Sequence, residues 1–321
     1  MTIRIGHLST FYHTATLLMP GGALNRNLPL EAEWRLFGTG PAIVQAFLRG
    51  ELDVAYMGLP PAMIGIANGA DICCVAGGHM EGTVFSGERG SLCFPQTKDL
   101  QSLLAQYAGK RIGVPGKGSI HDVILADCLR RFNLQGQIEI VNFPWADAIL
   151  EAFLRGELAA AFGTPALAVV LRRFARAQVV CPPQALWPDN PSYGIVVSRR
   201  FLQDKRETLM QFLDAHEAAT GFIRKDPQRA AEAIANCVHV VDESFVLETI
   251  LLSPRYCGKV TPPFIDSTMK FVGAMLHLGY MDKPLRSQDI FDTGPMDQVH
   301  GPGDHYRNMI NMCRIQPLIR L

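Results

Sequence analysis

The heptapeptide AFLRGEL occurs twice in the sequence, letter for letter, at residues 46–52 and again at residues 152–158. In both copies apolar residues at helical spacing precede the glycine, and a short apolar run follows it. Gly50 and Gly156 stand where the C-terminus of a helix favours a left-handed residue. Each copy therefore predicts a helix end, a glycine stop and the start of a strand. We expect two halves built on one plan.

The segments around the two copies follow the same order. Alternating or continuous apolar runs predict four strands in each half, separated by helical patterns. The predicted strands are residues 2–9, 30–38, 52–59 and 72–78 in the first half, and residues 110–116, 138–144, 158–164 and 177–183 in the second. Strands that alternate with helices predict an α/β protein, in which each half is a mainly parallel sheet covered by helices on both faces.

The chain continues beyond the second half. The pattern predicts a further strand at residues 192–201 and helices at residues 202–225, 227–237, 242–253 and 262–279. Residues 286–321 are punctuated by Gly and Pro and have little periodicity. They are expected to form an irregular C-terminal extension that wraps around the body.

The composition limits the kinds of partner. The 321 residues include 30 basic and 30 acidic side chains, and 48% of the residues are apolar. This balance is typical of a soluble globular protein and offers no basic excess for nucleic acid or an anionic membrane. The longest apolar runs are interrupted by Gly and Pro and are shorter than the roughly 20 residues of a membrane span. We expect a small-molecule ligand, no nucleic acid and no direct membrane insertion.

Eight cysteines are scattered along the chain, two of them adjacent (Cys73 and Cys74), and none forms a C-x-x-C pair. The pattern is typical of free, buried thiols in a reducing compartment, and it predicts neither a disulfide framework nor a metal site. The first residues, MTIRIGHLST, lack the basic and apolar regions of a signal peptide, which predicts a cytoplasmic protein. The alternative is a periplasmic or cell-surface protein whose leader has been removed.

Three stretches carry a family resemblance: residues 38–77, residues 109–134 and residues 147–171. In this order they resemble the nitrate-, sulfonate- and taurine-binding group of periplasmic binding proteins, which also contains the pyrimidine-precursor synthases of thiamine biosynthesis. The resemblance implies a two-lobed type II periplasmic-binding-protein fold. Lobe one would comprise residues 1–95 plus 192–285, and lobe two residues 100–187, with crossovers near residues 93–99 and 185–193. It also implies a ligand held between the lobes, and an ABC permease and ATPase as partners.

Ligands of open parallel sheets bind beyond the carboxyl ends of the strands, so the residues there are the candidates for binding. In lobe one they offer hydroxyls, imidazoles, aromatic faces and free backbone N–H groups at helix starts. These candidates are Ser9, Thr10, Phe11, Tyr12, His13, Gly38, Thr39, Gly40, Gly58, Leu59, Pro60, His79 and Glu81. The alternative for the aromatic residues and His13 is that they pack inward.

Lobe two and the second crossover supply the remaining candidates: Lys117, Gly118, Ser119, His121, Trp145, Thr164 and Tyr193. The run GKGSIHD does not have the order of a phosphate-binding P-loop, but Ser119 can cap a helix beside a lysine, which favours an anionic group. The alternative is an ordinary capped helix with a solvated lysine. Trp145 is expected to form a wall of the cleft.

Binding is favoured over catalysis. The synthases of the resembling family use a lysine for a pyridoxal cofactor and a sacrificial histidine, and the matching positions here are Met57 and Pro61, which cannot do that chemistry. His79 and Glu81 form an H-x-E pair without the P-C-x-x-C partner of the zinc deaminases. We therefore assign no catalytic residue and no cofactor.

Two alternatives to transport stay open. One is a cytoplasmic enzyme on the same scaffold, related to thiamine-precursor synthesis, with His13, His79 and His121 as proton-transfer groups. The other is a cytoplasmic ligand sensor, in which the extension from Asp289 onward forms the interaction surface.

Overall fold

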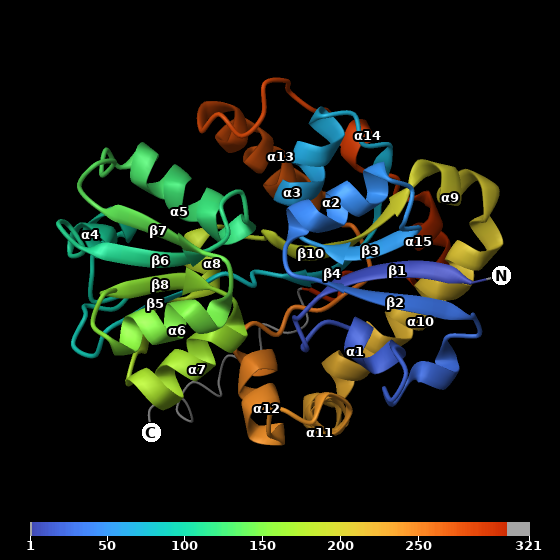
Figure 1. The fold of residues 1–321 in the computed structure, drawn as a ribbon, viewed down its shortest axis with the longest axis horizontal. Coiled ribbons are helices and arrows are strands. Elements are labelled where there is room, and N and C mark those ends of the chain that lie inside the picture. The colour runs from blue at the N-terminus through green and yellow to red at the C-terminus, as the bar shows by residue number, and fades with distance from the viewer. Residues whose placement is uncertain (1, 307–321) are drawn as a thin grey trace.

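The computed structural model describes residues 2–306 and contains two five-stranded sheets, one in each of two lobes that lie side by side (Figure 1). The first sheet has the order β2-β1-β3-β10-β4. Its strands are β1 (Ile3–Leu8), β2 (Ala32–Phe37), β3 (Val54–Met57), β4 (Ile72–Met80) and β10 (Pro191–Ser198). β1 pairs in parallel with β2 and β3, whereas β10 runs antiparallel to β3 and β4.

The second sheet repeats this plan in the order β7-β6-β8-β5-β9. Its strands are β5 (Val84–Gly87), β6 (Arg111–Pro115), β7 (Glu139–Phe143), β8 (Ala160–Gly163) and β9 (Gln178–Cys181). β6 pairs in parallel with β7 and β8, and β5 runs antiparallel to β8 and β9. Each sheet thus receives its antiparallel strand from the chain that has just arrived from the other lobe. The predicted α/β fold with two similar lobes is confirmed.

The first crossover lies elsewhere than expected. The chain leaves the first sheet at Met80 and begins β5 of the second sheet at Val84, so it crosses at residues 81–83 and not at residues 93–99. β5 falls within the segment that the sequence assigned to lobe one, yet it pairs with β8 and β9. The second crossing, between β9 and β10, occupies residues 182–190 and overlaps the expected one. The other lobe limits stay a prediction.

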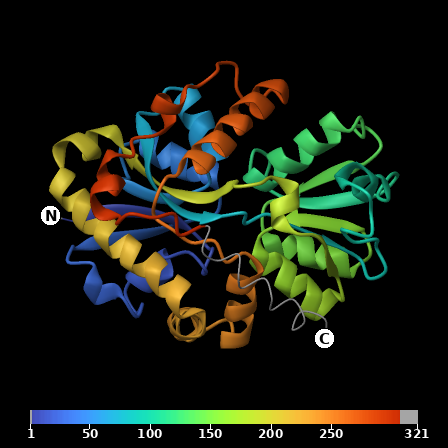
Figure 2. The same ribbon diagram turned by 180° about the vertical axis from the view of Figure 1, so that it is seen from behind.

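Helices cover both faces of each sheet, as the two opposite views show (Figures 1 and 2). In the first half of the chain they are α1 (Ala15–Leu18), η1 (Asn25–Asn27), α2 (Gly40–Leu48), α3 (Leu59–Ala67), α4 (Leu100–Ala105), α5 (Ile120–Arg131) and α6 (Ala146–Leu154). In the second half they are α7 (Pro165–Ala175), α8 (Pro183–Leu186), α9 (Arg199–Asp204), α10 (Arg206–Lys225), α11 (Pro227–Val238), α12 (Glu243–Leu252), α13 (Pro262–His277), α14 (Ser287–Ile290) and α15 (Gly294–Val299). Within the described residues, no helix is both long enough and apolar enough to cross a membrane.

The two AFLRGEL copies have the predicted local structure. The first ends α2 and the second ends α6, and Gly50 and Gly156 adopt φ of 68° and 71°. The backbone N–H of Glu51 donates to Ala46 O at 2.9 Å, and that of Glu157 donates to Ala152 O at 3.0 Å. The glycine in each copy therefore turns the chain out of its helix and toward the next strand.

The described part of the C-terminal extension, residues 286–306, packs on lobe one. Phe291 forms a parallel bridge with Cys74 of β4, and the backbone N–H of Asp292 donates to Cys74 O at 3.0 Å. Tyr306 is buried, and its hydroxyl donates to Cys257 O at 2.6 Å. Residues 307–321, which belong to the same predicted extension, lie outside the described residues.

Candidate functional site

The loop after β1 places its aromatic side chains inside lobe one. Tyr12 and His13 are buried, and the imidazole of His13 stacks on the ring of Tyr193 with 3.8 Å between centroids. Ser9 is exposed, whereas Thr10 and Phe11 are half-buried. Inward packing, the alternative to ligand contact, is therefore observed for most of the Tyr12 and His13 surface.

His13 keeps one nitrogen available. Its Nδ1 lies 2.7 Å from Thr10 Oγ1, and within residues 2–306 its Nε2 makes no hydrogen bond. Burial, followed by the neighbouring histidine His79, holds the pKa of His13 well below its usual range. At neutral pH the side chain is an uncharged imidazole that can exchange one hydrogen bond with a ligand.

His79 is held by lobe one itself. Its Nε2 lies 2.6 Å from Ser253 O and 2.9 Å from Ser253 Oγ, and its ring stacks on Tyr256 with 4.4 Å between centroids. Burial lowers the pKa of His79 to about 4. These contacts satisfy Nε2 and leave the buried Nδ1 without a partner in the described structure. The contacts give His79 a structural role.

Glu81 is also engaged within the protein. It has a positive φ of 60°, and its Oε1 accepts from Arg255 Nη1 at 2.5 Å and from the backbone N–H of Asp189 at 2.9 Å. The H-x-E pair therefore divides between two different partners and does not converge on one point. Among the described residues, the pair does not belong to a group of metal ligands.

The start of α2 meets lobe two. Thr39 caps the helix by accepting from Ala42 N at 3.4 Å, and Gly40 is buried against Pro61. Trp145 lies directly over Gly38, where an added Cβ would come within 2.5 Å of the indole Cη2. The indole is nevertheless 56% exposed. Trp145 thus covers the start of α2 from the other lobe and leaves more than half of its surface exposed, and its role as a cleft wall stays a prediction.

The start of α3 contributes shape only. Gly58 is half-buried beside the backbone oxygen of Ser192, and Leu59 and Pro60 are buried. None of the three offers a polar side chain, which agrees with the apolar character that the sequence indicates.

At the start of α5, the carboxylate of Asp122 from the same helix binds a free backbone N–H group. Ser119 caps the helix by accepting from Asp122 N at 3.3 Å, as predicted. Asp122 Oδ2 accepts the backbone N–H of Gly118 at 2.8 Å and the hydroxyl of Tyr280, and Oδ1 accepts from Asn142 at 2.9 Å. Lys117 is exposed. Because Asp122 already uses the Gly118 N–H, an anionic ligand is disfavoured at this helix start.

His121 links lobe two to the crossing chain. Its Nδ1 lies 3.0 Å from the hydroxyl of Thr83, which stands between β4 and β5, and the described structure gives its Nε2 no partner. Burial lowers the pKa of His121 to about 4, so this side chain is a second neutral imidazole.

Thr164 caps α7 by accepting from Leu167 N at 3.1 Å and stands near Tyr12 of lobe one. Burial raises the pKa of Tyr12, and the Thr164 hydroxyl opposes that shift. Tyr193 lies in β10, where its hydroxyl is 3.4 Å from Thr14 Oγ1. Thr164 and Tyr12 extend the line of interlobe contacts from the start of α2 to the start of α7, whereas the contact of Tyr193 with Thr14 lies within lobe one.

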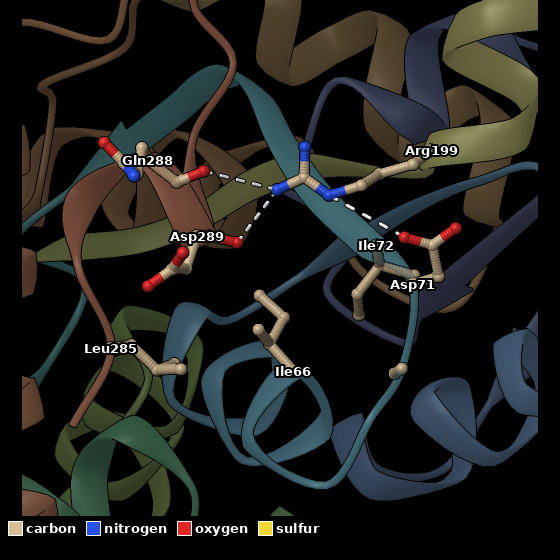
Figure 3. A pocket seen from close by; sticks show the side chains of 8 residues that line it. Ile66, Asp71, Ile72, Arg199, Leu285, Gln288 and Asp289 are labelled. Carbon is tan, nitrogen blue, oxygen red and sulfur yellow. Dashed lines mark hydrogen bonds and ion pairs between the residues drawn. The ribbon is translucent and has the colours of Figure 1, made fainter. Parts of the chain in front are cut away.

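Two surface pockets lie at the amino ends of the parallel strands of the first sheet, opposite the predicted site. One, of about 550 Å³, lies between Asp71, Arg199, Leu285 and Asp289 (Figure 3). Its Arg199 donates to the backbone oxygens of Gln288 at 3.4 Å and Asp289 at 3.0 Å. The other, of about 610 Å³, includes Arg4 and Asp53. Both lie beside the amino end of β4, away from the carboxyl ends that the sequence singled out.

A second interlobe contact joins α7 to α12. Arg173 Nη1 lies 3.0 Å from Asp242 Oδ2, its Nη2 lies 2.9 Å from Glu248 Oε1, and Arg172 also pairs with Glu248. The sequence did not single out these residues, nor Thr83, Asp122 and Tyr280. Thr83 lies two positions after Glu81 of the H-x-E pair, and Asp122 is the last residue of the run GKGSIHD. Nothing local marks the others, because their partners are distant in the chain.

Comparison with known sequences identifies distant relatives. One relative is a Brucella abortus protein whose name describes it as a binding protein. It is 21% identical to this chain over 242 residues, which make up 74% of this chain and 72% of the relative. This chain is also 28% identical over 131 residues to the taurine-binding periplasmic protein of Escherichia coli. The matched residues make up 40% of this chain and 38% of that protein.

Solved structures share the fold. The periplasmic aliphatic sulphonate binding protein SsuA from Escherichia coli has a TM-score of 0.76 at 17% identity, over 94% of both chains. The periplasmic nitrate-binding protein NrtA from Synechocystis PCC 6803 has a TM-score of 0.72 at 9% identity, over 93% of this chain and 88% of the other. The fold is therefore the two-lobed periplasmic-binding-protein fold. The model of the NMT1-like family matches residues 2–238, and the chain belongs to that family.

Proposed function

We propose that this protein is a solute-binding protein that captures one small anionic or heteroaromatic ligand between its lobes for an ABC importer. The observation that carries the proposal is that predicted site residues make one of the contacts between the lobes: Trp145 lies over Gly38, and His121 bonds to Thr83 of the crossing chain. A ligand inserted at these contacts would touch both lobes at once, which is the requirement for hinge closure.

The names of the similar proteins support an anionic ligand, since they specify taurine, aliphatic sulphonate and nitrate. Those similar proteins are periplasmic, which supports the same location and an ABC permease and ATPase as partners here. The start of α2, with its Thr39 cap, is the helix terminus that suits a negative group.

The side chains favour the heteroaromatic class. Burial lowers the pKa values of His13 and His121, so that both are neutral hydrogen-bonding groups at pH 7. The exposed face of Trp145 offers a stacking surface. Asp122 adds a carboxylate near the start of α5. Neutral imidazoles and an aromatic face suit a planar ring with polar edges better than a strongly charged group.

A thermal-shift screen followed by calorimetry tests the proposal. The probes are taurine, alkanesulfonates, nitrate, small carboxylates and pyrimidines, and a ligand at 100 times its Kd adds about 2.7 kcal/mol to the free energy of unfolding. Stabilisation by pyrimidines alone assigns the heteroaromatic class, and stabilisation by sulfonates or nitrate alone assigns the anionic class. A screen in which no compound raises the melting temperature overturns the proposal.

Two variants locate the site. Gly38→Val places a side chain against Trp145 and is expected to weaken binding by about tenfold or more, because overpacking costs about 1–3 kcal/mol. Gly273→Val, at a glycine of α13 with open space around it, is the matched control and should bind as the parent does. Equal affinity of both variants for the ligand would place the binding site elsewhere.

A further inference from the structure

Three side chains that commonly bind metals meet beneath the C-terminal extension. Cys257 lies in the loop after α12, and His300 and His305 lie in the segment after α15. Cys257 Sγ is 3.1 Å from His300 Nε2 and 3.7 Å from His305 Nδ1. The two nitrogen atoms are 3.1 Å apart. One sulfur and two nitrogens therefore surround a single point, outside the interlobe site.

The spacing suits a tetrahedral ion. Zinc binds nitrogen at about 2.0–2.1 Å and sulfur at about 2.3 Å, so ligand atoms at the corners of a tetrahedron lie about 3.3–3.6 Å apart. The observed separations of 3.1 Å, 3.1 Å and 3.7 Å bracket this range. Shifts of a few tenths of an ångström would bring all three atoms to bonding distance.

Glu217 of α10 lies beside the two histidines, outside the group of three whose ligand atoms all lie within 4.8 Å of one another. Its Oε1 is 3.7 Å from both His300 Nε2 and His305 Nδ1. The carboxylate is oriented by Gly258 N at 2.9 Å and Thr220 Oγ1 at 2.8 Å, both on Oε2, and by Arg224 Nη2 at 2.9 Å on Oε1. Hydrogen bonds of this kind fix the carboxylates that ligate metals.

Neighbouring backbone groups form hydrogen bonds with His300 and Cys257 that favour metal binding by His300 Nε2 and Cys257 Sγ. His300 Nδ1 lies 2.6 Å from Gly301 O, and because a carbonyl oxygen only accepts, Nδ1 carries the proton and Nε2 presents its lone pair to the cluster. The backbone N–H of Lys259 donates to Cys257 Sγ at 3.4 Å, which stabilises a thiolate. Cys257 and the side chain of His300 are both 0% exposed, so water competes little for either.

We propose that Cys257, His300 and His305 bind one divalent transition-metal ion, zinc by preference, with the Glu217 carboxylate or a water completing its coordination, and that this ion fastens the C-terminal extension to lobe one. Cys257 and the neighbouring Gly258 are tied to β4, since Gly77 N donates to Gly258 O at 2.7 Å. The ion would thus join the extension to the edge of the first sheet. This replaces the prediction of no metal site, which relied on the lack of a C-x-x-C pair.

The sequence does carry part of the signal. His300 and His305 have the H-x4-H spacing that zinc sites use, within a loop rich in Gly and Pro. The cysteine lies 43 positions earlier, so no local motif joins it to the histidines. Three ligands of mixed type, one sulfur and two nitrogens, favour zinc or cobalt over magnesium or calcium, which prefer oxygen alone.

Titration of the chelator-stripped full chain with Co²⁺ alone tests the proposal. We expect one equivalent to bind, with a thiolate-to-cobalt charge-transfer absorption in the near ultraviolet and the visible bands of tetrahedral cobalt, and we expect Zn²⁺ to displace it. Elemental analysis should find one zinc per chain after dialysis. A chain that retains no zinc and develops no charge-transfer absorption overturns the proposal.

Variants identify the ligands. Cys257→Ser should abolish the charge-transfer absorption, and His305→Gln should weaken Co²⁺ binding by more than the roughly 10- to 100-fold that outer-shell changes cost. His305 is partly exposed, so this variant remains informative if Cys257→Ser does not fold. Cys237→Ser, at a half-buried cysteine of α11, is the matched control and should bind as the parent does. Parent-like binding by His305→Gln, or loss of binding in Cys237→Ser, overturns the assignment.

Discussion

Glu81 and Arg255 form a buried ion pair, with Oε1 of Glu81 2.5 Å from Nη1 of Arg255, at the point where the chain passes between the lobes. The same guanidinium binds Asp189 Oδ1 at 2.8 Å. Glu81 belongs to the first crossing segment and Asp189 to the second, while Arg255 follows α12. One arginine therefore ties both crossing segments to lobe one.

Removing this arginine should destabilise the fold strongly. The side chain of Glu81 is 2% exposed, so Arg255→Ala leaves a buried carboxylate without its cation. Breaking one side of a buried ion pair costs about 3–5 kcal/mol. Urea unfolding measures the loss in the free energy of unfolding.

The control is the exposed pair at the end of the first AFLRGEL copy. Arg49 and Glu51 are 56% and 38% exposed, so Glu51→Gln should change the free energy of unfolding by less than about 1 kcal/mol. Similar losses in Arg255→Ala and Glu51→Gln would show that the Arg255 network contributes no more than a surface pair.

The ion pairs between α7 and α12 should favour the closed arrangement of the lobes. Arg173 contacts Asp242 and Glu248 and lies over the ring of Phe245, with 5.2 Å from its Cζ to the ring centroid. Arg173→Ala is expected to shift the protein toward a more open shape by about 1 kcal/mol, because partly exposed pairs are weak singly. Small-angle X-ray scattering should report a larger radius of gyration.

Salt provides the internal check on this contact. Raising ionic strength screens partly exposed charges, so high salt should open the parent and leave Arg173→Ala almost unchanged. Arg155→Ala, which breaks exposed pairs at the end of α6, is the control and should scatter as the parent does. An unchanged radius of gyration in Arg173→Ala would mean that these pairs do not hold the lobes together.

The fold could be predicted because its signals are local. The period of apolar residues identified every strand of the two sheets except β5, and the repeated glycine stop indicated the two similar halves. The first crossing was misplaced since it takes only residues 81–83 and has no linker signature. The proline-containing segment near Cys93 looked more like a linker. β5 is assigned to the second sheet only by pairing with β8 and β9, which begin more than 70 residues later.

The candidate site was predictable only in outline. Parallel strands present their carboxyl ends at one edge, so the residues there could be named. The partners of these residues could not be named, because His79 bonds to Ser253 at a separation of 174 positions and Asp122 to Tyr280 at 158. Packing between distant segments decides which side chains keep a free polar atom. The ligand-binding roles of the named residues stay a prediction.

The two copies of AFLRGEL should respond alike to mutation. Gly50 and Gly156 both have positive φ and open space around the Cβ position, so an added methyl group tests conformation alone. Gly50→Ala and Gly156→Ala should each lower the free energy of unfolding by about 1–2 kcal/mol, the cost of a left-handed L-residue. Urea unfolding of the two variants gives the values.

Gly273 supplies the comparison for these glycines. It lies inside α13 with open space around it and without a positive φ, so Gly273→Ala should raise the free energy of unfolding by up to about 1 kcal/mol. Different losses at Gly50 and Gly156 would contradict the view that both copies perform the same structural task.

The stability of the protein should fall in mild acid because of His121. Burial lowers the pKa of His121 from 6.5 to about 4. Between these two pH values the imidazole is therefore protonated in the unfolded chain and neutral in the folded chain. The free energy of unfolding therefore declines as the pH falls from 6.5 toward 4, by up to about 1.4 kcal/mol per pH unit from this group.

His121→Gln keeps a polar group for Thr83 and removes the titration. Urea unfolding at about pH 7, 6 and 5 should give a shallower pH dependence for this variant than for the parent, whereas His277→Gln, at an exposed histidine of α13, should retain the parental slope. If His121→Gln and the parent lose stability equally between pH 6 and 5, His121 is not the buried neutral imidazole that its contact with Thr83 indicates.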